Sequence, residues 1–393
     1  MTTNATSRLP SEQRINAEDA ARSQRIRQGI LEAGNALRAR HPWLEKYQNT
    51  IGMAIFWASI AGILGTAWAY YAGVFAWYVA IPVAAICMSL LHELEHDLIH
   101  MMYFRKNKFW NDFMLGGVWL FRPSTISPWV RRRLHIHHHK VSGTESDLEE
   151  RGITNGEKWG LKRLLMTGDN MLAIYLRPFA TYKMTRAFVR EVAKSKEEAH
   201  AIARENVMGY FPLGIINYTL WHGFIVYYAG LFLLGLAGIA PEAVALPVQS
   251  ALASAGFNVD VLATVQGVMN VVGFYVVIIA APNALRTFCL HFVSSNMHYY
   301  GDVEKGNIVQ QCQIWTTPWA IPLHLFCFNF AGTHAFHHFV VRDPFYVRQW
   351  LAPGLYPLMR ENGIRFNDFG TFKRANRMHA ASVTAPVTQQ AAA

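Results

Sequence analysis

Two long stretches of the chain are strongly apolar and contain no basic residue. No Lys or Arg occurs within residues 47–104 or within residues 205–285. Each stretch is long enough for two helices of about 20 apolar residues, the length that crosses a bilayer. The pattern therefore predicts an all-α integral membrane protein with about four transmembrane helices in two hairpins.

The expected segments can be placed along the chain from the apolar runs and the turn residues between them. In chain order they are a span at 51–71, a turn at 72–73, a span from 74 to 91 and beyond, a span at about 210–239, a loop through 241–260 and a span at about 261–281.

The basic residues indicate which side of the membrane each segment faces. All 36 Lys and Arg lie outside the two apolar stretches, with eight before them, nineteen between them and nine after them. Two hairpins place both termini and the middle segment on one side, and an excess of Lys and Arg marks the cytoplasmic side. We therefore expect both termini to be cytoplasmic. Buried helices of a large soluble core are the alternative, which the complete segregation of charge disfavours.

Composition agrees with a membrane protein and narrows the possible partners. Hydrophobic residues make up 52% of the chain and charged residues only 16%, well below the quarter that is typical of soluble domains. The net charge of +10 is explained by basic segments that lie against anionic lipid, so no nucleic acid partner is expected. None of the four cysteines forms a Cys-x-x-Cys pair, which argues against a disulfide scaffold, a zinc ribbon or an iron–sulfur centre.

We expect three parts along the chain. These are an N-terminal cytoplasmic segment at 1–48, a membrane domain at 49–345 and a C-terminal cytoplasmic tail at 346–393.

Histidines form three clusters, and a single histidine stands between the last two. The clusters and the single residue are His92-Glu93-Leu94-Glu95-His96, His135-Ile136-His137-His138-His139, His298, and His334-Ala335-Phe336-His337-His338. In a helix, residues three or four apart share a face, so each cluster can direct imidazoles toward one metal ion or two neighbouring ions. Imidazole suits iron, copper and zinc.

The predicted topology brings these clusters together. The first cluster falls at the cytoplasmic end of the second expected span, and the other clusters fall in cytoplasmic segments. A metal-binding group at such a boundary indicates a functional site. Taken alone, each cluster has an ordinary explanation, such as a basic membrane-binding patch beside Arg131–Arg133 or histidines satisfied within a core. Their common location favours one shared metal centre.

The histidine pattern also permits a different enzyme class. His92-Glu93-x-x-His96 matches the zinc-protease motif in which the glutamate acts as general base. That interpretation leaves most of the clustered histidines without a role. Metal content would separate the two classes, with one zinc for the protease against two irons for the alternative below.

The combination of His-x-x-x-His, His-x-x-His-His and a later His-x-x-His-His with two membrane hairpins resembles the membrane fatty acid desaturase/hydroxylase superfamily. The resemblance covers about residues 50–345 and implies a helical cytoplasmic cap that holds two irons. The ligands it implies are His92, His96, His135, His138, His139, His298, His334, His337 and His338. Where acyl-CoA desaturases carry an Asn four residues before the single histidine, this chain has Ser294.

The resemblance further implies an O2-dependent oxidoreductase that acts on a long fatty acyl chain, with internal desaturation as the expected reaction. Hydroxylation, or decarboxylation to a terminal alkene, are alternatives at the same site. The acyl group could be a free acid, an acyl-CoA, an acyl-carrier protein thioester or a lipid. Nearby basic residues such as Arg131–Arg133, Lys140 and Arg286 could hold its head group. Because no electron carrier is fused to the chain, a separate ferredoxin, rubredoxin or cytochrome with its reductase is expected.

Overall fold

The computed structural model describes residues 16–380 of the 393-residue chain. Within this range the chain is helical, without a β-strand, and contains only two isolated β-bridges. The α-helices are α1 (Ala17–Arg40), α2 (Trp43–Lys46), α3 (Gln48–Tyr71), α4 (Trp77–Ile99), α5 (Lys108–Phe121), α6 (Pro128–Val141), α7 (Leu148–Ile153), α8 (Leu161–Gly168), α9 (Asn170–Leu176), α10 (Pro178–Val192), α11 (Lys196–Met208), α12 (Leu213–Leu236), α13 (Pro241–Ser254), α14 (Val261–Tyr275), α15 (Ala281–Met297), α16 (Ile321–Leu325), α17 (Phe330–Phe339) and α18 (Phe345–Glu361).

Within residues 16–380, four helical segments are long and apolar enough to cross a membrane, which agrees with the predicted all-α class and the predicted number of membrane-length helices. These segments are Gln48–Tyr71, Trp77–Ile99, Lys196–Leu236 and Val261–Met297. The first two are α3 and α4, and the turn between them contains Gly73 at φ +72°, a left-handed conformation that glycine adopts at little cost. The other two reach beyond their apolar cores into polar sequence at one end.

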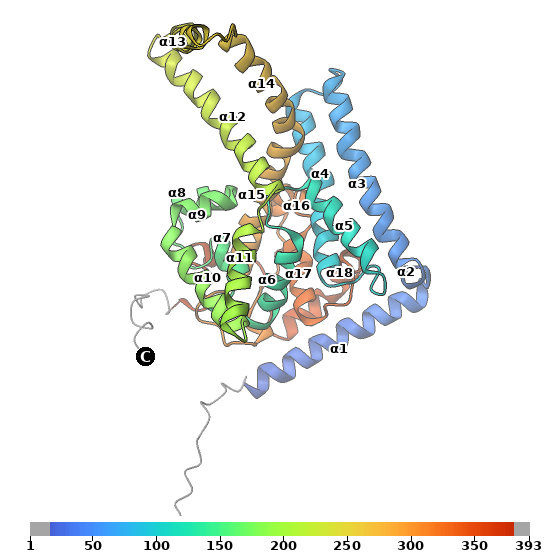
Figure 1. Ribbon diagram of the computed structural model, residues 1–393. Helices are drawn as coiled ribbons and strands as arrows, with labels where there is room; N and C mark the ends of the chain where they lie inside the picture. Colours follow the sequence, from blue (N-terminus) through green and yellow to red (C-terminus); the bar gives the residue numbers. More distant parts are fainter. Residues whose placement is uncertain (1–15, 381–393) are drawn as a thin grey trace, which may run out of the picture.

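The prediction of a loop at 241–260 is wrong, because most of this segment forms the helix α13 (Figure 1). Pro241 stands at the first position of this helix, where its missing N–H costs nothing. The residues that follow are rich in Ala and Leu, the strongest helix formers. Pro241 therefore marks the start of a helix within the expected loop.

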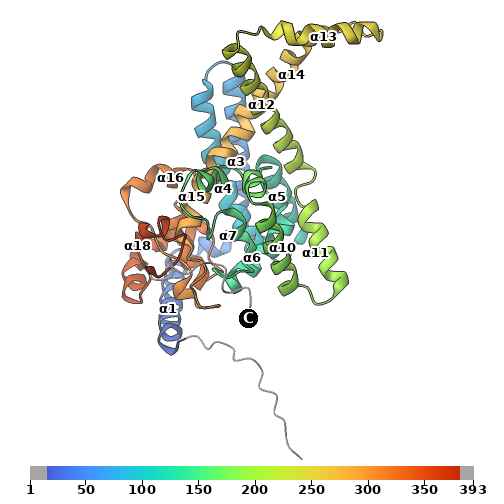
Figure 2. The same ribbon diagram turned by 90° about the vertical axis from the view of Figure 1, so that its left-hand side faces the viewer.

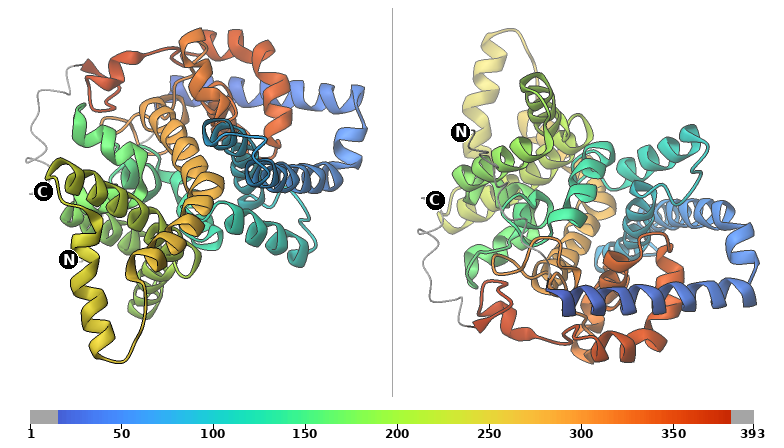
Figure 3. Two further views of the ribbon diagram at one scale, coloured as in Figure 1. Left: turned by 90° about the horizontal axis from the view of Figure 1, so that it is seen from above. Right: turned by 90° about the horizontal axis from the view of Figure 1, so that it is seen from below.

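The hairpin helices α3, α4, α12 and α14 extend from one side of a broad helical layer (Figures 1 and 2). Helix α13 lies at their far end. The remaining helices gather at the opposite end, and we refer to them as the cap. Seen along the hairpins, α3 and α4 pack beside the α14–α15 segment, while α1 runs along the far side of the cap (Figure 3).

The fourth membrane-length segment continues from the hairpin directly into the cap. A π-helical turn, Val276–Ala280, joins α14 to α15, and Pro282 is the second residue of α15. Proline has no N–H to donate to the preceding turn, and such π turns often accompany a disturbed helical ladder. Helix α15 is largely buried in the cap, and His298 follows it as the C-cap residue.

Two apolar cores hold the cap and the first hairpin together. One core joins α3, α4 and α5 and includes Phe56, Met88 and Met114. The other joins α1, α15, α17 and α18 and includes Ile26 and Phe336. The described parts of the segments expected at 1–48 and 346–393 thus pack against each other on the second core, while residues 1–15 and 381–393 lie outside the described range.

Candidate metal centre

Four segments that lie far apart in the sequence bring the clustered histidines to one place in the cap. Helix α4 ends with the first cluster, α6 carries the second and α17 carries the third, while His298 follows the last residue of α15. The spacing of three and four residues places the histidines of each helix on one face, as the sequence predicts. Facing helices therefore present their histidines to one another.

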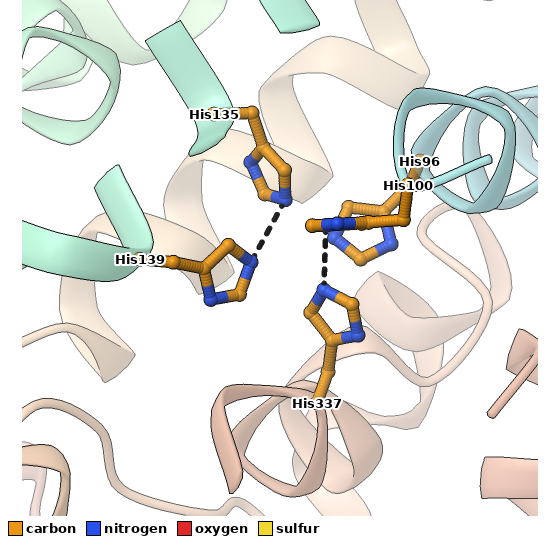
Figure 4. A group of neighbouring side chains, drawn as sticks. All are labelled: His96, His100, His135, His139 and His337. Atoms are coloured by element: carbon orange, nitrogen blue, oxygen red, sulfur yellow. Dashed lines mark hydrogen bonds between the residues drawn. The ribbon is translucent and has the colours of Figure 1, made fainter. Parts of the chain in front are cut away.

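The first histidine group contains five residues from three helices: His96, His100, His135, His139 and His337. One ring nitrogen from each of these residues lies within 4.8 Å of the corresponding atoms of the others. The Nε2 atoms of His135 and His139 are 3.1 Å apart, and those of His100 and His337 are 2.9 Å apart. Figure 4 shows the rings converging from α4, α6 and α17 on a common space.

The second histidine group contains His138, His298, His334 and His338, all of them buried. Their ring nitrogens also lie within 4.8 Å of one another. The Nε2 atoms of His334 and His338 are 3.1 Å apart. The two groups are neighbours, because the ring centroids of His139 and His338 are only 4.8 Å apart.

Nitrogen separations in both groups fit metal ions. Two nitrogens at about 2.1 Å from one ion are about 3.0 Å apart when they subtend a right angle. A single pair at this separation would equally suit an N–H···N hydrogen bond, so the argument rests on five nitrogens converging in one group and four in the other. Both ring nitrogens of His96 and Nε2 of His298 are buried and find no hydrogen-bond partner among residues 16–380. A metal ion would satisfy such atoms.

The opposite nitrogen of several histidines is held by an acceptor. Nδ1 of His135 lies 2.7 Å from Glu149 and Nδ1 of His138 lies 3.0 Å from Asp147. Nδ1 of His338 lies 2.8 Å from Oε1 of Gln311. When Nδ1 donates to such an oxygen, Nε2 keeps its lone pair for a metal, an arrangement typical of protein metal sites.

His337 differs from these residues, because its Nδ1 lies 2.7 Å from a guanidinium nitrogen of Arg348. Arginine only donates, so this nitrogen accepts the hydrogen bond. Arg348 also pairs with Asp97 and lies 3.5 Å from Glu93. A neutral imidazole that accepts a hydrogen bond at Nδ1 carries its proton on Nε2. For a neutral His337 to bind a metal through Nε2, Arg348 would have to give up its hydrogen bond to Nδ1 and keep only its contacts with Asp97 and Glu93.

Burial keeps most of these histidines in the neutral form that metal binding requires. Burial lowers the pKa of His100 to about 2 and holds the pKa values of His139, His334 and His338 well below the ordinary value, with neighbouring histidines adding to the effect. His138 is the exception: burial opposes its charged form, but Asp147 outweighs burial and raises its pKa to about 9. Metal binding at His138 would therefore displace a proton.

The structure brings eight of the nine predicted ligands into the two groups and leaves His92 outside both. His92 lies one turn before His96, with a buried Nδ1 that has no hydrogen-bond partner among the described residues. His100, which the resemblance does not include, joins the first group. The repeat His92-x-x-x-His96-x-x-x-His100 was the available signal, since it offers two pairs at the same helical spacing.

Two carboxylates beside the histidines, Glu149 and Glu150, were not singled out in the sequence. They lie in the first turn of α7, whose N-cap residue Asp147 accepts a hydrogen bond from the Glu150 N–H. Glu150 accepts a hydrogen bond from Ser294 and lies 3.5 Å from Nδ1 of His298. Ser294 thus contacts the acid that faces His298, whereas the neighbouring Asn296 pairs with Arg163, away from both groups.

A cavity of about 460 Å³ adjoins the two groups. Six histidines border it: His92, His96, His135, His138, His291 and His334. The rest of its wall comes from α6, α7, α9–α11, α15, α17 and the segments beside them, with Leu134, Ile153, Ile174, Leu290 and Phe330 among the apolar side chains. The volume lies within the range of small-molecule sites, and the exposed Val207 at the end of α11 marks where the cavity meets the surface.

Comparison with known proteins supports the interpretation of the histidine pattern. Residues 74–246 match the family model described as fatty acid desaturase. No curated protein matches the chain. The matched segment contains the first two histidine clusters and ends before His298 and the third cluster. This match confirms the resemblance to the membrane fatty acid desaturase/hydroxylase superfamily.

Proposed function

We propose that the chain is an O2-dependent membrane oxidoreductase that holds two irons and acts on a long fatty acyl chain, because residues 74–246 match the fatty acid desaturase model. Internal desaturation is the leading reaction. The observation that carries this proposal is the pair of adjacent histidine groups bordering one cavity. A substrate in that cavity would lie beside both groups.

Each proposed iron has its own set of ligands. The first histidine group would hold one ion and the second would hold the other. Bound iron would supply, with O2, the oxidising power needed to remove hydrogen from an unactivated C–H bond. Imidazole nitrogen suits iron, and the absence of thiolates from both groups sets this site apart from structural zinc sites.

The surrounding residues would orient the ligands and exclude water. Asp147, Glu149 and Gln311 fix the direction in which their histidines point. The apolar part of the cavity wall would hold the acyl chain in one position relative to the histidine groups. Positioning of this kind selects which carbon reacts, and exclusion of water suppresses side reactions.

We also propose that the cap and both termini are cytoplasmic, as the positions of the basic residues favour. Electrons would come from a separate ferredoxin, rubredoxin or cytochrome with its reductase. If the purified protein turned over at full rate with NAD(P)H alone, this part of the proposal would be wrong.

The zinc-protease alternative agrees less well with the geometry. It requires His92 and His96 to bind one zinc ion while Glu93 faces the same ion. His96 instead belongs to the first histidine group, which His92 does not join. Glu93 lies 3.5 Å from the Arg348 guanidinium, an interaction that the protease mechanism does not use.

The reaction can be tested by expressing wild type, His138→Ala and His337→Ala in one host and comparing extracted lipids and headspace by gas chromatography–mass spectrometry. His200→Ala is the matched control, because His200 is exposed on α11. We expect a new internal double bond with wild type and the control only. A terminal alkene or an ω-alcohol would keep the metal site but assign the protein as a decarboxylase or hydroxylase. Unchanged products in both cluster variants would contradict the metal assignment.

A further inference from the structure

The wall of the cavity contains three arginines, of which two have carboxylate partners. Arg122 forms an ion pair with Glu95. Arg131 lies 2.9 Å from Glu95 and 3.3 Å from Glu149. These residues form a chain of alternating charge that leads through Glu149 to His135.

The third arginine, Arg286, has no such partner. Its side chain is 2% exposed, and it forms no ion pair with any residue in the described range 16–380. One guanidinium nitrogen donates to the hydroxyl of Thr287, whereas Nε and Nη1 have no hydrogen-bond partner there. Glu150, another carboxylate on the cavity wall, is turned toward Ser294 and His298 instead.

An unpaired guanidinium in such a place is costly. Arginine stays charged in proteins, and buried charges are normally paired. Free donors on a guanidinium suit a carboxylate, whose oxygens accept strong, charge-assisted hydrogen bonds from arginine. The wall of this cavity therefore carries one positive charge, that of Arg286, which no carboxylate among residues 16–380 neutralises.

Helix α15 connects this guanidinium with the metal centre. Arg286, Leu290 and Ser294 follow one another at four-residue intervals and all border the cavity. The next residue in this series, His298, belongs to the second histidine group. One helix face thus leads from the arginine, past an apolar side chain, to a predicted metal ligand.

We infer that Arg286 binds the carboxylate of a free fatty acid inside this cavity, so that the substrate enters as the acid and not as a thioester. The inference rests on the proposed function, because it assigns the head group of that function's substrate. A thioester has no carboxylate, and its acyl carbonyl would leave the Arg286 charge uncompensated. Because the carboxylate is anchored at a fixed point, the carbon that reacts is set by its distance from the carboxyl end.

Binding can be measured on the purified full-length protein in detergent by isothermal titration calorimetry, with dodecanoate and methyl dodecanoate as the two probes. We expect wild type to bind dodecanoate roughly tenfold to a hundredfold more tightly than the methyl ester, as a hydrogen-bonded charge pair implies. Arg286→Gln should abolish this difference, and Arg286→Lys should restore part of it. Arg186→Gln, which changes an exposed arginine on α10, should bind like wild type.

Thermal unfolding without ligand checks that the variants fold. Because Arg286→Gln removes a buried charge that lacks a partner, we expect its unfolding midpoint to be no lower than that of wild type. Equal affinity of wild type for the acid and the ester, or undiminished dodecanoate binding by Arg286→Gln, would overturn the inference.

Product analysis supplies an independent readout. With free acids of ten, twelve and fourteen carbons, we expect oxidation at the same carbon counted from the carboxyl group. A position that stays constant when counted from the methyl end would contradict anchoring by Arg286. If the iron-loaded enzyme oxidised no acyl chain but still bound dodecanoate through Arg286, the oxidase proposal would fail and the carboxylate site would stand.

Discussion

At the scale of single residues, the metal assignment depends on which histidines of α4 face the other clusters. His92, His96 and His100 repeat at the same interval, so sequence spacing alone permits either neighbouring pair. Packing decides between them, because α6 and α17 meet α4 at its last turn, where His96 and His100 lie within the first histidine group. His92 borders the cavity instead.

Replacing each of these two residues tests this choice. We expect His100→Ala to lower the iron content of the purified protein, because it removes a ligand from the first histidine group. His92→Ala should retain the iron of wild type and change only substrate binding or product distribution. Iron and protein can be quantified on the same samples. Loss of iron from His92→Ala together with full iron in His100→Ala would reverse the assignment.

Asp147 has two roles, because it faces His138 and also caps the N-terminus of α7. Asn is an equally good N-cap, so Asp147→Asn should preserve the helix while removing the negative charge beside His138. We expect about 10- to 100-fold weaker iron binding, measured by chelator competition.

Asp260→Asn provides the matched control, since Asp260 caps α14 through a 2.9 Å hydrogen bond and is exposed, away from the histidine groups. Iron affinity equal to that of wild type in Asp147→Asn would show that the carboxylate does not support the ligand.

At the scale of helices, the sequence predicts those features that depend on the length and polarity of a segment. The four membrane-length segments follow directly from the two stretches without Lys or Arg. Helix α13 was not predicted, and it begins with Pro241 inside the stretch that was expected to be a loop. Close contacts between helices are a further property that a hydrophobic pattern cannot reveal.

Helices α3 and α5 meet at Gly117. A Cβ atom added there would lie 2.4 Å from Cζ of the buried Phe56, whereas one added at the neighbouring Gly116 would meet nothing closer than 3.9 Å. We expect Gly117→Ala to lower the unfolding free energy by about 1–3 kcal/mol through overpacking. Gly116→Ala should be neutral or stabilising, because Ala favours helix. Equal unfolding midpoints for the two variants would contradict this packing.

At the scale of the whole molecule, the hairpins carry little chemistry and the cap carries most of it. The sequence indicates that the histidine clusters share one side of the membrane, because the hairpins return the chain to that side each time. It does not reveal the cavity, because the cavity wall combines residues from α4 to α17 whose contacts arise only on folding. The sequence likewise does not reveal that Arg286 lacks an ion pair, because this depends on which carboxylate side chains lie near it in the folded protein.

Orientation in the membrane can be tested with reporter fusions. Gly256 follows α13 at the far end of the second hairpin and is exposed. We expect alkaline phosphatase inserted at Gly256 to be active in a bacterial host, because the proposed orientation places that end in the periplasm. A green fluorescent protein fused after residue 393 should fluoresce, because the same orientation places the terminus in the cytoplasm. The opposite pair of results would invert the proposed orientation.

The central claim is that the two histidine groups hold two irons, and metal analysis of the purified wild-type protein tests it most directly. Inductively coupled plasma mass spectrometry on protein from iron-replete cells should give about two irons per chain, one for each group, with little zinc. One zinc per chain, or metal content that is the same in wild type and in His138→Ala, would contradict the account.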